Sequence, residues 1–219
     1  MNGRLLVTNL IRRGGIYGLT AEKFSLGRSN PDVVRAMLDA GVRIVQYREK
    51  TKKAGAKYEE CLALRAMTRE AGAAFIVNDD IDLALLVDAD GVHVGQEDLP
   101  VAAVRSLVGE GRAIGLSTHS PDQARAAVAA GADYIGVGPI YATQTKDDVC
   151  APVGLSYLDF VVREIGLPFV AIGGIKEHNL AEVAGRGARC TALVTEIVGV
   201  PDIRGKVAAL HRVLGAVRE

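Results

Sequence analysis

Short apolar runs recur along the whole chain, and the stretches between them place their apolar residues at helical spacing. Several runs, such as 73–77, are apolar at consecutive positions, which is typical of strands covered on both faces, as in a parallel sheet. The eight predicted strands are 16–21, 43–49, 73–79, 91–95, 113–119, 134–140, 168–174 and 190–197. They begin on average about 25 residues apart, the length of one compact strand–helix unit.

Signals for helix ends lie between the predicted strands. Ser120-Pro121-Asp122-Gln123 combines a capping serine, a proline at the first helical position and a glutamine three residues after the cap. Glycines that follow helix-like stretches can adopt the left-handed conformation that ends a helix. These glycines are Gly41, Gly72, Gly91, Gly131 and Gly187.

Eight strands that alternate with helices predict an α/β fold with parallel strands. We expect one domain over residues 1–219, a (β/α)8 TIM barrel from about residue 16 to 219 with a short N-terminal extension over residues 1–15. A doubly wound open sheet is the alternative. In a barrel, the side chains at the C-terminal ends of the strands face the active site, so the chemistry is sought there.

Composition narrows the classes of function. The chain has 219 residues with 26 Lys and Arg against 26 Asp and Glu, so it lacks the basic excess of a protein that coats nucleic acid or an anionic membrane. No apolar run approaches the roughly 18 residues of a membrane helix. The 3 cysteines are far apart, which predicts neither a disulfide framework nor a zinc site and favours the cytoplasm.

Polar residues that could bind a ligand or a metal ion follow the second, third and fourth predicted strands. Gln46, Arg48 and Lys50 alternate along an extended segment, so their side chains can point to one side. Asp79 and Asp98 follow two neighbouring strands, and Mg²⁺ takes one or two protein carboxylates together with water and substrate phosphate. The alternatives are a solvated turn for the cations and helix capping for Asp79.

The fifth strand ends at Ser117-Thr118-His119-Ser120, where Ser120 serves as a helix cap and Ser117 is the better ligand contact. His119, and His93 within the fourth strand, are interpreted as satisfied structural groups. The motif Gly-x-Ser-x-Gly is absent, so the sequence gives little support to covalent hydrolase chemistry.

Later strand ends carry candidate phosphate contacts. The loop from residue 141 to about 155 is long enough for a lid, and it holds Thr143, Thr145 and Lys146. Gly173-Gly174 ends the seventh strand and Thr195 lies near the end of the eighth, where barrels commonly bind phosphate through backbone N–H groups.

Six segments together resemble the thiamine-phosphate synthase family in order and spacing. They are Val45-Gln46-Tyr47-Arg48-Glu49-Lys50, Val77-Asn78-Asp79-Asp80, Val92-His93-Val94-Gly95-Gln96-Glu97-Asp98, Ile114-Gly115-Leu116-Ser117-Thr118-His119, Thr143-Gln144-Thr145-Lys146 and Ala171-Ile172-Gly173-Gly174-Ile175. The resemblance covers about residues 16 to 200. Enzymes of that family join 4-amino-2-methyl-5-(hydroxymethyl)pyrimidine diphosphate to a thiazole phosphate or its carboxylated form. They release thiamine monophosphate and pyrophosphate, with CO₂ from the carboxylated thiazole.

The resemblance implies a role for each matching residue. Contacts to the pyrimidine diphosphate would come from Gln46, Tyr47, Arg48, Glu49, Lys50, Asn78, Ser117 and Lys146. The thiazole phosphate would be bound by Thr143, Gln144, Thr145, Gly174, Val194 and Thr195. Asp79 and Asp98 would hold one Mg²⁺, and Arg48, Lys50 and Lys146 would supply the catalytic positive charge.

The implied chemistry is a dissociative substitution in which pyrophosphate leaves, a stabilised pyrimidine-methyl cation forms and the thiazole nitrogen attacks it. Such a route needs positioning and positive charge but no protein nucleophile. The expected partners are therefore the two small-molecule substrates, with no nucleic acid and no membrane, for a chain acting alone or as a homo-oligomer.

One position departs from the family pattern, which has Ser and a small residue where this chain has Thr195-Glu196. Alternation along a strand would place Glu196 on the face opposite Thr195, away from the phosphate. Three alternatives stay open: a thiazole tautomerase paralogue, a non-catalytic thiamine-phosphate binding protein, and a generic sugar-phosphate isomerase or aldolase barrel. A tautomerase would have no use for the full set of Arg48, Lys50, Asp79, Asp98 and Lys146.

Overall fold

The chain forms a closed barrel of eight parallel strands in sequence order, β1 to β8, as the hydrophobic pattern predicts. The computed structural model describes residues 2–145 and 150–218. The strands are β1 Gly15–Leu19, β2 Ile44–Tyr47, β3 Ala74–Asn78, β4 Gly91–Val94, β5 Ala113–Thr118, β6 Tyr134–Val137, β7 Phe169–Ile172 and β8 Cys190–Leu193. Because β8 pairs with β1, the open-sheet alternative is wrong.

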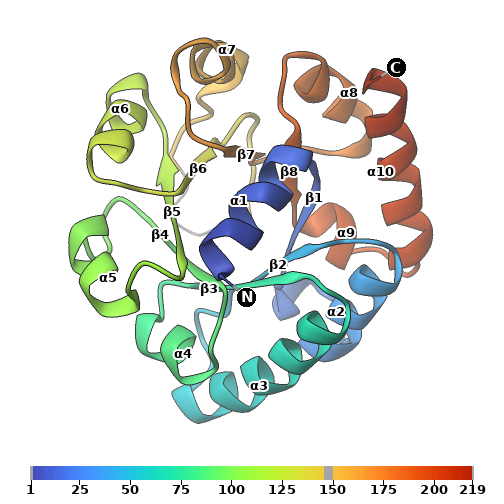
Figure 1. The fold of residues 1–219 in the computed structure, drawn as a ribbon. Helices are drawn as coiled ribbons and strands as arrows, with labels where there is room; N and C mark the ends of the chain where they lie inside the picture. Colours follow the sequence, from blue (N-terminus) through green and yellow to red (C-terminus); the bar gives the residue numbers. More distant parts are fainter. Residues whose placement is uncertain (1, 146–149, 219) are drawn as a thin grey trace.

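Helices surround the barrel and follow the strands (Figure 1). Within the described residues they are α1 Gly3–Arg13, the short 3-10 helix η1 Glu22–Phe24, α2 Asn30–Asp39, α3 Ala54–Glu70, α4 Ile81–Leu86, α5 Val101–Val108, α6 Pro121–Ala129, α7 Gly154–Glu164, α8 Glu177–Gly185, α9 Thr195–Val198 and α10 Ile203–Arg218. The predicted cap is confirmed, since the Ser120 side chain accepts a hydrogen bond from the Gln123 backbone N–H.

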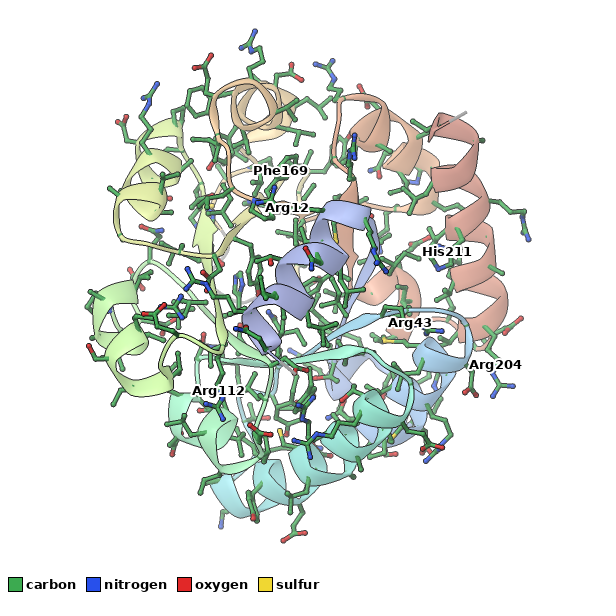
Figure 2. The ribbon with its side chains drawn as sticks, viewed as in Figure 1. Arg12, Arg43, Arg112, Phe169, Arg204 and His211 are labelled. Atoms are coloured by element: carbon green, nitrogen blue, oxygen red, sulfur yellow. The ribbon has the colours of Figure 1, made fainter. Side chains whose placement is uncertain are left out.

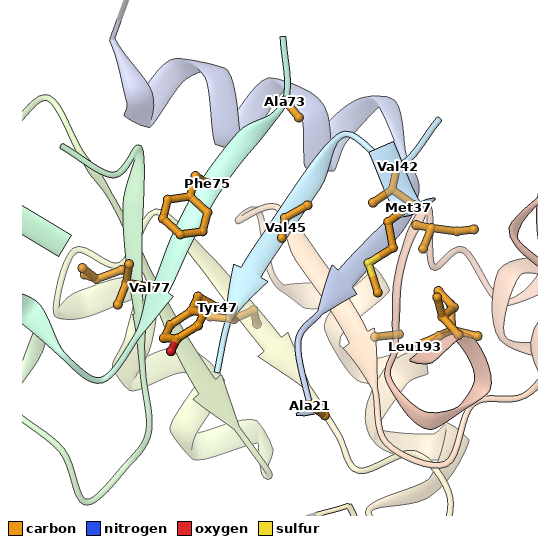
Figure 3. Packing of buried hydrophobic residues seen from close by; sticks show 14 of the residues in the cluster. Ala21, Met37, Val42, Val45, Tyr47, Ala73, Phe75, Val77 and Leu193 are labelled. Carbon is orange, nitrogen blue, oxygen red and sulfur yellow. The ribbon is translucent and has the colours of Figure 1, made fainter. Parts of the chain in front are cut away.

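Alternate residues of each strand face the ring of helices or the barrel interior. Val45 and Tyr47 of β2 lie beside Phe75 and Val77 of β3 in the layer that packs against helices (Figure 3). All four are at most 1% exposed. The opposite parity of β2 therefore points into the barrel, and Gln46 lies there.

Four of the five predicted helix-ending glycines have the expected backbone conformation. Gly41, Gly72, Gly131 and Gly187 have φ between 63° and 103°. The prediction for Gly91 is wrong, because this glycine is the first residue of β4. A Cβ there would lie 2.6 Å from the carbonyl oxygen of Ala113, so the neighbouring strand explains the glycine.

The N-terminal extension forms helix α1, which crosses the end of the barrel where the strands begin (Figure 1). Val7 and Ile11 are at most 2% exposed and pack against interior residues such as Tyr17 and Ile44. Burial of a side chain of this size contributes about 1.5 to 3 kcal/mol. Helix α1 thus closes the end of the barrel where the strands begin, and the end where the strands finish remains for the site.

Charged side chains lie around the outer rim, as Arg204 of α10 does in Figure 2. Arg204 forms an ion pair with Asp39 at the end of α2. Among the described residues, none of the helices combines the length and hydropathy required to cross a membrane.

Candidate active site

The end of β2 carries the row of polar residues that the alternation predicts. Gln46 is 3% exposed, and its amide nitrogen donates to the Tyr17 hydroxyl at 2.9 Å. The Arg48 backbone N–H donates to the Thr20 hydroxyl at 2.8 Å, which fixes the chain just beyond the strand. The Lys50 ammonium forms an ion pair with the Asp79 carboxylate. Lys50 thus links the ends of β2 and β3.

Tyr47 and Glu49 occupy the other parity and have their partners outside the barrel. The Tyr47 hydroxyl donates to Glu60 of α3 at 2.7 Å, and burial together with this carboxylate raises the pKa of Tyr47 above its ordinary range. Glu49 accepts hydrogen bonds from the Asn30 side chain and the Glu22 backbone N–H, each at 3.0 Å. Their side chains therefore anchor the β2 end to the surrounding layer.

Asp79 and Asp98 come together at the ends of β3 and β4. Asp79 has φ of 61°, and its N–H donates to the His93 carbonyl at 2.9 Å, which turns the chain sharply after β3. Burial raises the pKa of Asp79; the Lys50 ammonium opposes this change and the nearby Asp98 carboxylate adds to it. Asp98 also accepts from the Gly95 N–H at 2.7 Å, which holds it close to the end of β4.

This pair fits a magnesium ion better than a transition metal. The described residues contain no group of three or more His, Cys, Asp and Glu side chains placed to hold an ion. Mg²⁺ needs no such cage, since it keeps several waters and binds through one or two carboxylates with substrate phosphate. Two adjacent carboxylates, one of them paired with Lys50, are a donor set of that kind.

Ser117 lies at the end of β5 beside His93 of β4. The His93 Nε2 atom is 3.0 Å from the Ser117 hydroxyl, and the Gln96 side chain donates to the Ser117 carbonyl at 2.7 Å. Asn78 ends β3 and is paired in register with His93. The predicted contacts Gln46, Asn78 and Ser117 therefore each lie at the last or next-to-last residue of a strand. They belong to the upper rim of the barrel, the ring formed by the C-terminal ends of the strands.

The loop after β6 brings two predicted phosphate contacts together. The hydroxyl groups of Thr143 and Thr145 are 3.0 Å apart, and the Gln144 side chain is exposed. The next predicted residue, Lys146, lies outside the described residues.

Gly174, Val194 and Thr195 lie at the ends of β7 and β8. Gly174 has φ of 65°, and a Cβ there would lie 2.6 Å from the carbonyl oxygen of Ala142, so the β7 end packs tightly against the loop after β6. Val194 directly precedes α9. The Thr195 hydroxyl accepts from the Lys176 ammonium at 2.8 Å. Backbone, hydroxyl and cation thus converge at this rim.

The predicted strand over 190–197 is wrong beyond Leu193, because residues Thr195–Val198 form the short helix α9. The alternation argument for Glu196 therefore does not apply. Its charge is balanced by Lys176 at 3.4 Å and Lys206 at 3.2 Å. Burial would raise the pKa of Glu196, but Lys206, the Glu177 backbone N–H and Lys176 outweigh it and hold the pKa below its ordinary value.

Four residues near the site are absent from the sequence-based set of contacts. Lys176 lies four residues after the end of β7 and directly before α8, and no motif marks it as different from other surface lysines. Tyr17 and Tyr134 are fully buried and place their hydroxyl groups in the barrel interior. The sequence signal that could have found them is a tyrosine within an apolar run. His93, interpreted from sequence as a structural group, contacts both Tyr134 and Ser117.

Comparison with known proteins identifies the family. The family model described as Thiamine monophosphate synthase matches residues 16–197. The thiamine-phosphate synthase of Pelotomaculum thermopropionicum is 68% identical over 91% of both chains, and that of Lawsonia intracellularis is 54% identical over 91% of this chain and 92% of its own. The solved thiamine phosphate pyrophosphorylase from Pyrococcus furiosus superposes with a TM-score of 0.88 at 33% identity, covering 96% of this chain and 100% of that one. The chain belongs to the thiamine-phosphate synthase family of transferases.

Proposed function

We propose that the chain joins the pyrimidine diphosphate to a thiazole phosphate, with release of pyrophosphate, and with CO₂ when the thiazole is carboxylated. The observation that carries this assignment is the cluster of Lys50, Asp79 and Asp98 beside Gln46 and Arg48. Cations and a pair of carboxylates on one rim suit a diphosphate with its metal ion. An enzyme that only isomerises a thiazole has no diphosphate for this cluster to bind.

The residues of the β2, β3 and β5 ends are assigned to the pyrimidine diphosphate. Gln46, Asn78 and Ser117 bind and orient the substrate, and Arg48 and Lys50 face its diphosphate. The family pattern assigns Lys146, which lies outside the described residues, to the same diphosphate. Tyr47 and Glu49 act through the backbone, since their side chains are bonded to Glu60, Asn30 and the Glu22 N–H.

Asp79 and Asp98 are assigned to Mg²⁺, which when bound would neutralise negative charge on the diphosphate. The residues of the chain do the rest by position and charge. Arg48, Lys50 and Lys146 stabilise the charge that develops as the bond from the pyrimidine methylene carbon to the diphosphate oxygen breaks. The freed electron pair leaves with pyrophosphate, and the thiazole nitrogen supplies the pair for the new bond to carbon. Holding the thiazole in line with that carbon lowers the barrier without a protein nucleophile.

The thiazole phosphate is assigned to the opposite part of the rim. Hydroxyl groups of the β6 loop and of Thr195 donate to the phosphate, and Lys176 adds positive charge beside Thr195. Because Glu196 is paired with Lys206 and Lys176, its carboxylate does not oppose the phosphate strongly. The contacting residues are Thr143, Gln144, Thr145, Gly174, Val194 and Thr195.

Replacing Thr195 with valine is expected to raise the KM for the thiazole phosphate about tenfold, the scale of one hydrogen bond to a charged group. The KM for the pyrimidine diphosphate should stay unchanged in steady-state assays. The matched control is Thr191→Val in β8, the strand that precedes Thr195; Thr191 is fully buried and pairs in register with Ile16 and Ala171, both in the helix-facing layer. Equal KM values for both substrates in Thr195→Val and wild type would remove Thr195 from the phosphate site.

The cytoplasm is the proposed location. Cys61 and Cys190 are buried, Cys150 is exposed, and none of the three forms a disulfide bond with another described residue. Cysteines outside disulfide bonds are typical of a reducing compartment.

The direct test mixes the purified chain with the pyrimidine diphosphate, the thiazole phosphate and Mg²⁺, with an EDTA control. We expect equal amounts of thiamine monophosphate and pyrophosphate, measured by chromatography and a pyrophosphate-release assay, and no product with EDTA. Isomerised thiazole as the only product would identify a tautomerase instead. Tight binding of thiamine phosphate without turnover would identify a binding protein.

A further inference from the structure

Five polar side chains form a continuous chain of hydrogen bonds through the barrel interior. The Gln46 amide nitrogen is 2.9 Å from the Tyr17 hydroxyl, which is 3.0 Å from the Tyr134 hydroxyl. Tyr134 lies 3.1 Å from His93 Nδ1, and His93 Nε2 lies 3.0 Å from the Ser117 hydroxyl. The chain therefore begins and ends at residues assigned to the pyrimidine substrate and runs between them through β1, β6 and β4.

The barrel is shaped to leave room for this chain. A Cβ at Gly115 would lie 2.2 Å from the Tyr134 ring and 2.4 Å from His93 Nδ1, and a Cβ at Gly136 would lie 3.4 Å from the His93 ring. Any side chain at Gly115 would therefore displace Tyr134 or His93. The glycine at this position on β5 is explained by the two rings and not by a turn.

The donor and acceptor atoms allow only one direction of donation along this chain of hydrogen bonds. The Gln46 nitrogen can only donate, so the single proton of Tyr17 is available for Tyr134. Tyr134 then donates its own proton to Nδ1 of His93, which places the imidazole proton on Nε2, facing Ser117. Burial raises the pKa of both tyrosines far above the ordinary value, so each keeps its proton. Ser117 accepts at the end of the chain, and its own proton remains for a ligand.

We propose that Tyr17, Tyr134 and His93 are positioning residues that hold Ser117 as a hydrogen-bond donor toward an acceptor atom of the pyrimidine substrate. The role rests on the proposed function of the site. Without this chain of hydrogen bonds, His93 loses the donor that fixes its tautomer, and the Ser117 hydroxyl can turn its proton toward the imidazole. The substrate acceptor then competes with the protein for that one proton.

A double-mutant cycle in the intact protein tests the proposal. Tyr134→Phe and Ser117→Ala should each lower kcat/KM for the pyrimidine diphosphate about tenfold, the scale of one hydrogen bond. The double variant should lose no more than Ser117→Ala alone, because Tyr134 acts through Ser117. The KM for the thiazole phosphate should stay unchanged throughout. Losses that multiply to about a hundredfold would overturn the proposal.

Tyr157→Phe is the matched control. The Tyr157 hydroxyl is also buried and donates at 2.7 Å to Thr118, the residue next to Ser117, but on the helix-facing side of β5. Removal of the Tyr157 hydroxyl should lower the midpoint of thermal unfolding about as much as Tyr134→Phe does, and should leave kcat/KM at the wild-type value. Tyr134→Phe kinetics indistinguishable from those of Tyr157→Phe would reduce Tyr134 to a structural role.

A second pair of variants keeps the test decisive if Tyr134→Phe fails to fold. His93→Gln keeps an amide donor near the Nε2 position and should stay within about threefold of wild type, whereas His93→Leu should lose about tenfold. Equal losses in the two would count against positioning. Wild-type turnover, measured in parallel, separates the two hypotheses: absent product in wild type rejects the proposed function, whereas normal wild-type product with multiplying losses rejects only the positioning role.

Discussion

The Asp98→Asn variant is expected to form thiamine monophosphate with a kcat about two orders of magnitude below wild type, the scale of losing one preorganised electrostatic group. Asp98 and Asp79 are close enough for one carboxylate to raise the pKa of the other, which is why both are assigned to the same ion. Asparagine keeps the shape of the side chain and can still accept from the Gly95 N–H. The loss should therefore come from charge and not from misfolding.

The measurement has two parts. Steady-state rates over a range of Mg²⁺ concentrations should show a weaker metal dependence, and Mn²⁺ binding followed by electron paramagnetic resonance should show lower affinity. Asp122→Asn is the matched control, because Asp122 is 95% exposed on α6 and its ion pair is with the neighbouring Arg125. A near wild-type kcat and Mn²⁺ affinity in Asp98→Asn would end the assignment of this residue as a metal ligand.

The order and number of the barrel elements follow from local pattern alone. Runs such as 73–77 are apolar on both parities because helices cover one face of the strand and the barrel interior the other. Alternation also predicts that Gln46, Arg48 and Lys50 share one side at the end of β2. For this reason a candidate functional face can be predicted from the sequence without knowledge of long-range contacts.

Other features depend on contacts between segments far apart in the sequence. Gly91 has the pattern of a helix-ending glycine, yet its reason is the approach of Ala113 from the next strand. Residues 195–198 follow the apolar run of β8 but form α9, so Glu196 meets Lys206 and Lys176 instead of lying on the far face of a strand. Local alternation contains no information about such partners.

The interior hydrogen-bond chain shows the same limit within the site. His93 is a lone histidine in an apolar strand, and a structural role is a sound interpretation from sequence. The closed barrel brings Tyr134 to one of its ring nitrogens and Ser117 to the other. The same imidazole thus makes a structural contact and the contact proposed to position Ser117, and both depend on the neighbouring places of β4, β5 and β6 in the barrel.

Lys50→Ala should change metal binding and catalysis in opposite directions. The Lys50 ammonium is paired with Asp79, so it competes with a metal ion for this carboxylate. Without Lys50, Asp79 and Asp98 face each other with less compensating charge, and Mn²⁺ should bind more tightly in the absence of substrate. The kcat should nevertheless fall about a hundredfold, because the departing diphosphate loses one of its cations.

These opposite signs distinguish Lys50 from a residue that only supports the metal ligands. A supporting residue would lower metal affinity and kcat together, as Asp98→Asn is expected to do. Lys57→Ala is the matched control, since Lys57 pairs at 2.7 Å with Asp80, the residue next to Asp79, and that carboxylate is not assigned to the metal. It should leave both quantities near wild type. Parallel losses of Mn²⁺ affinity and kcat in Lys50→Ala would show that the lysine organises the carboxylates and does not act on the diphosphate.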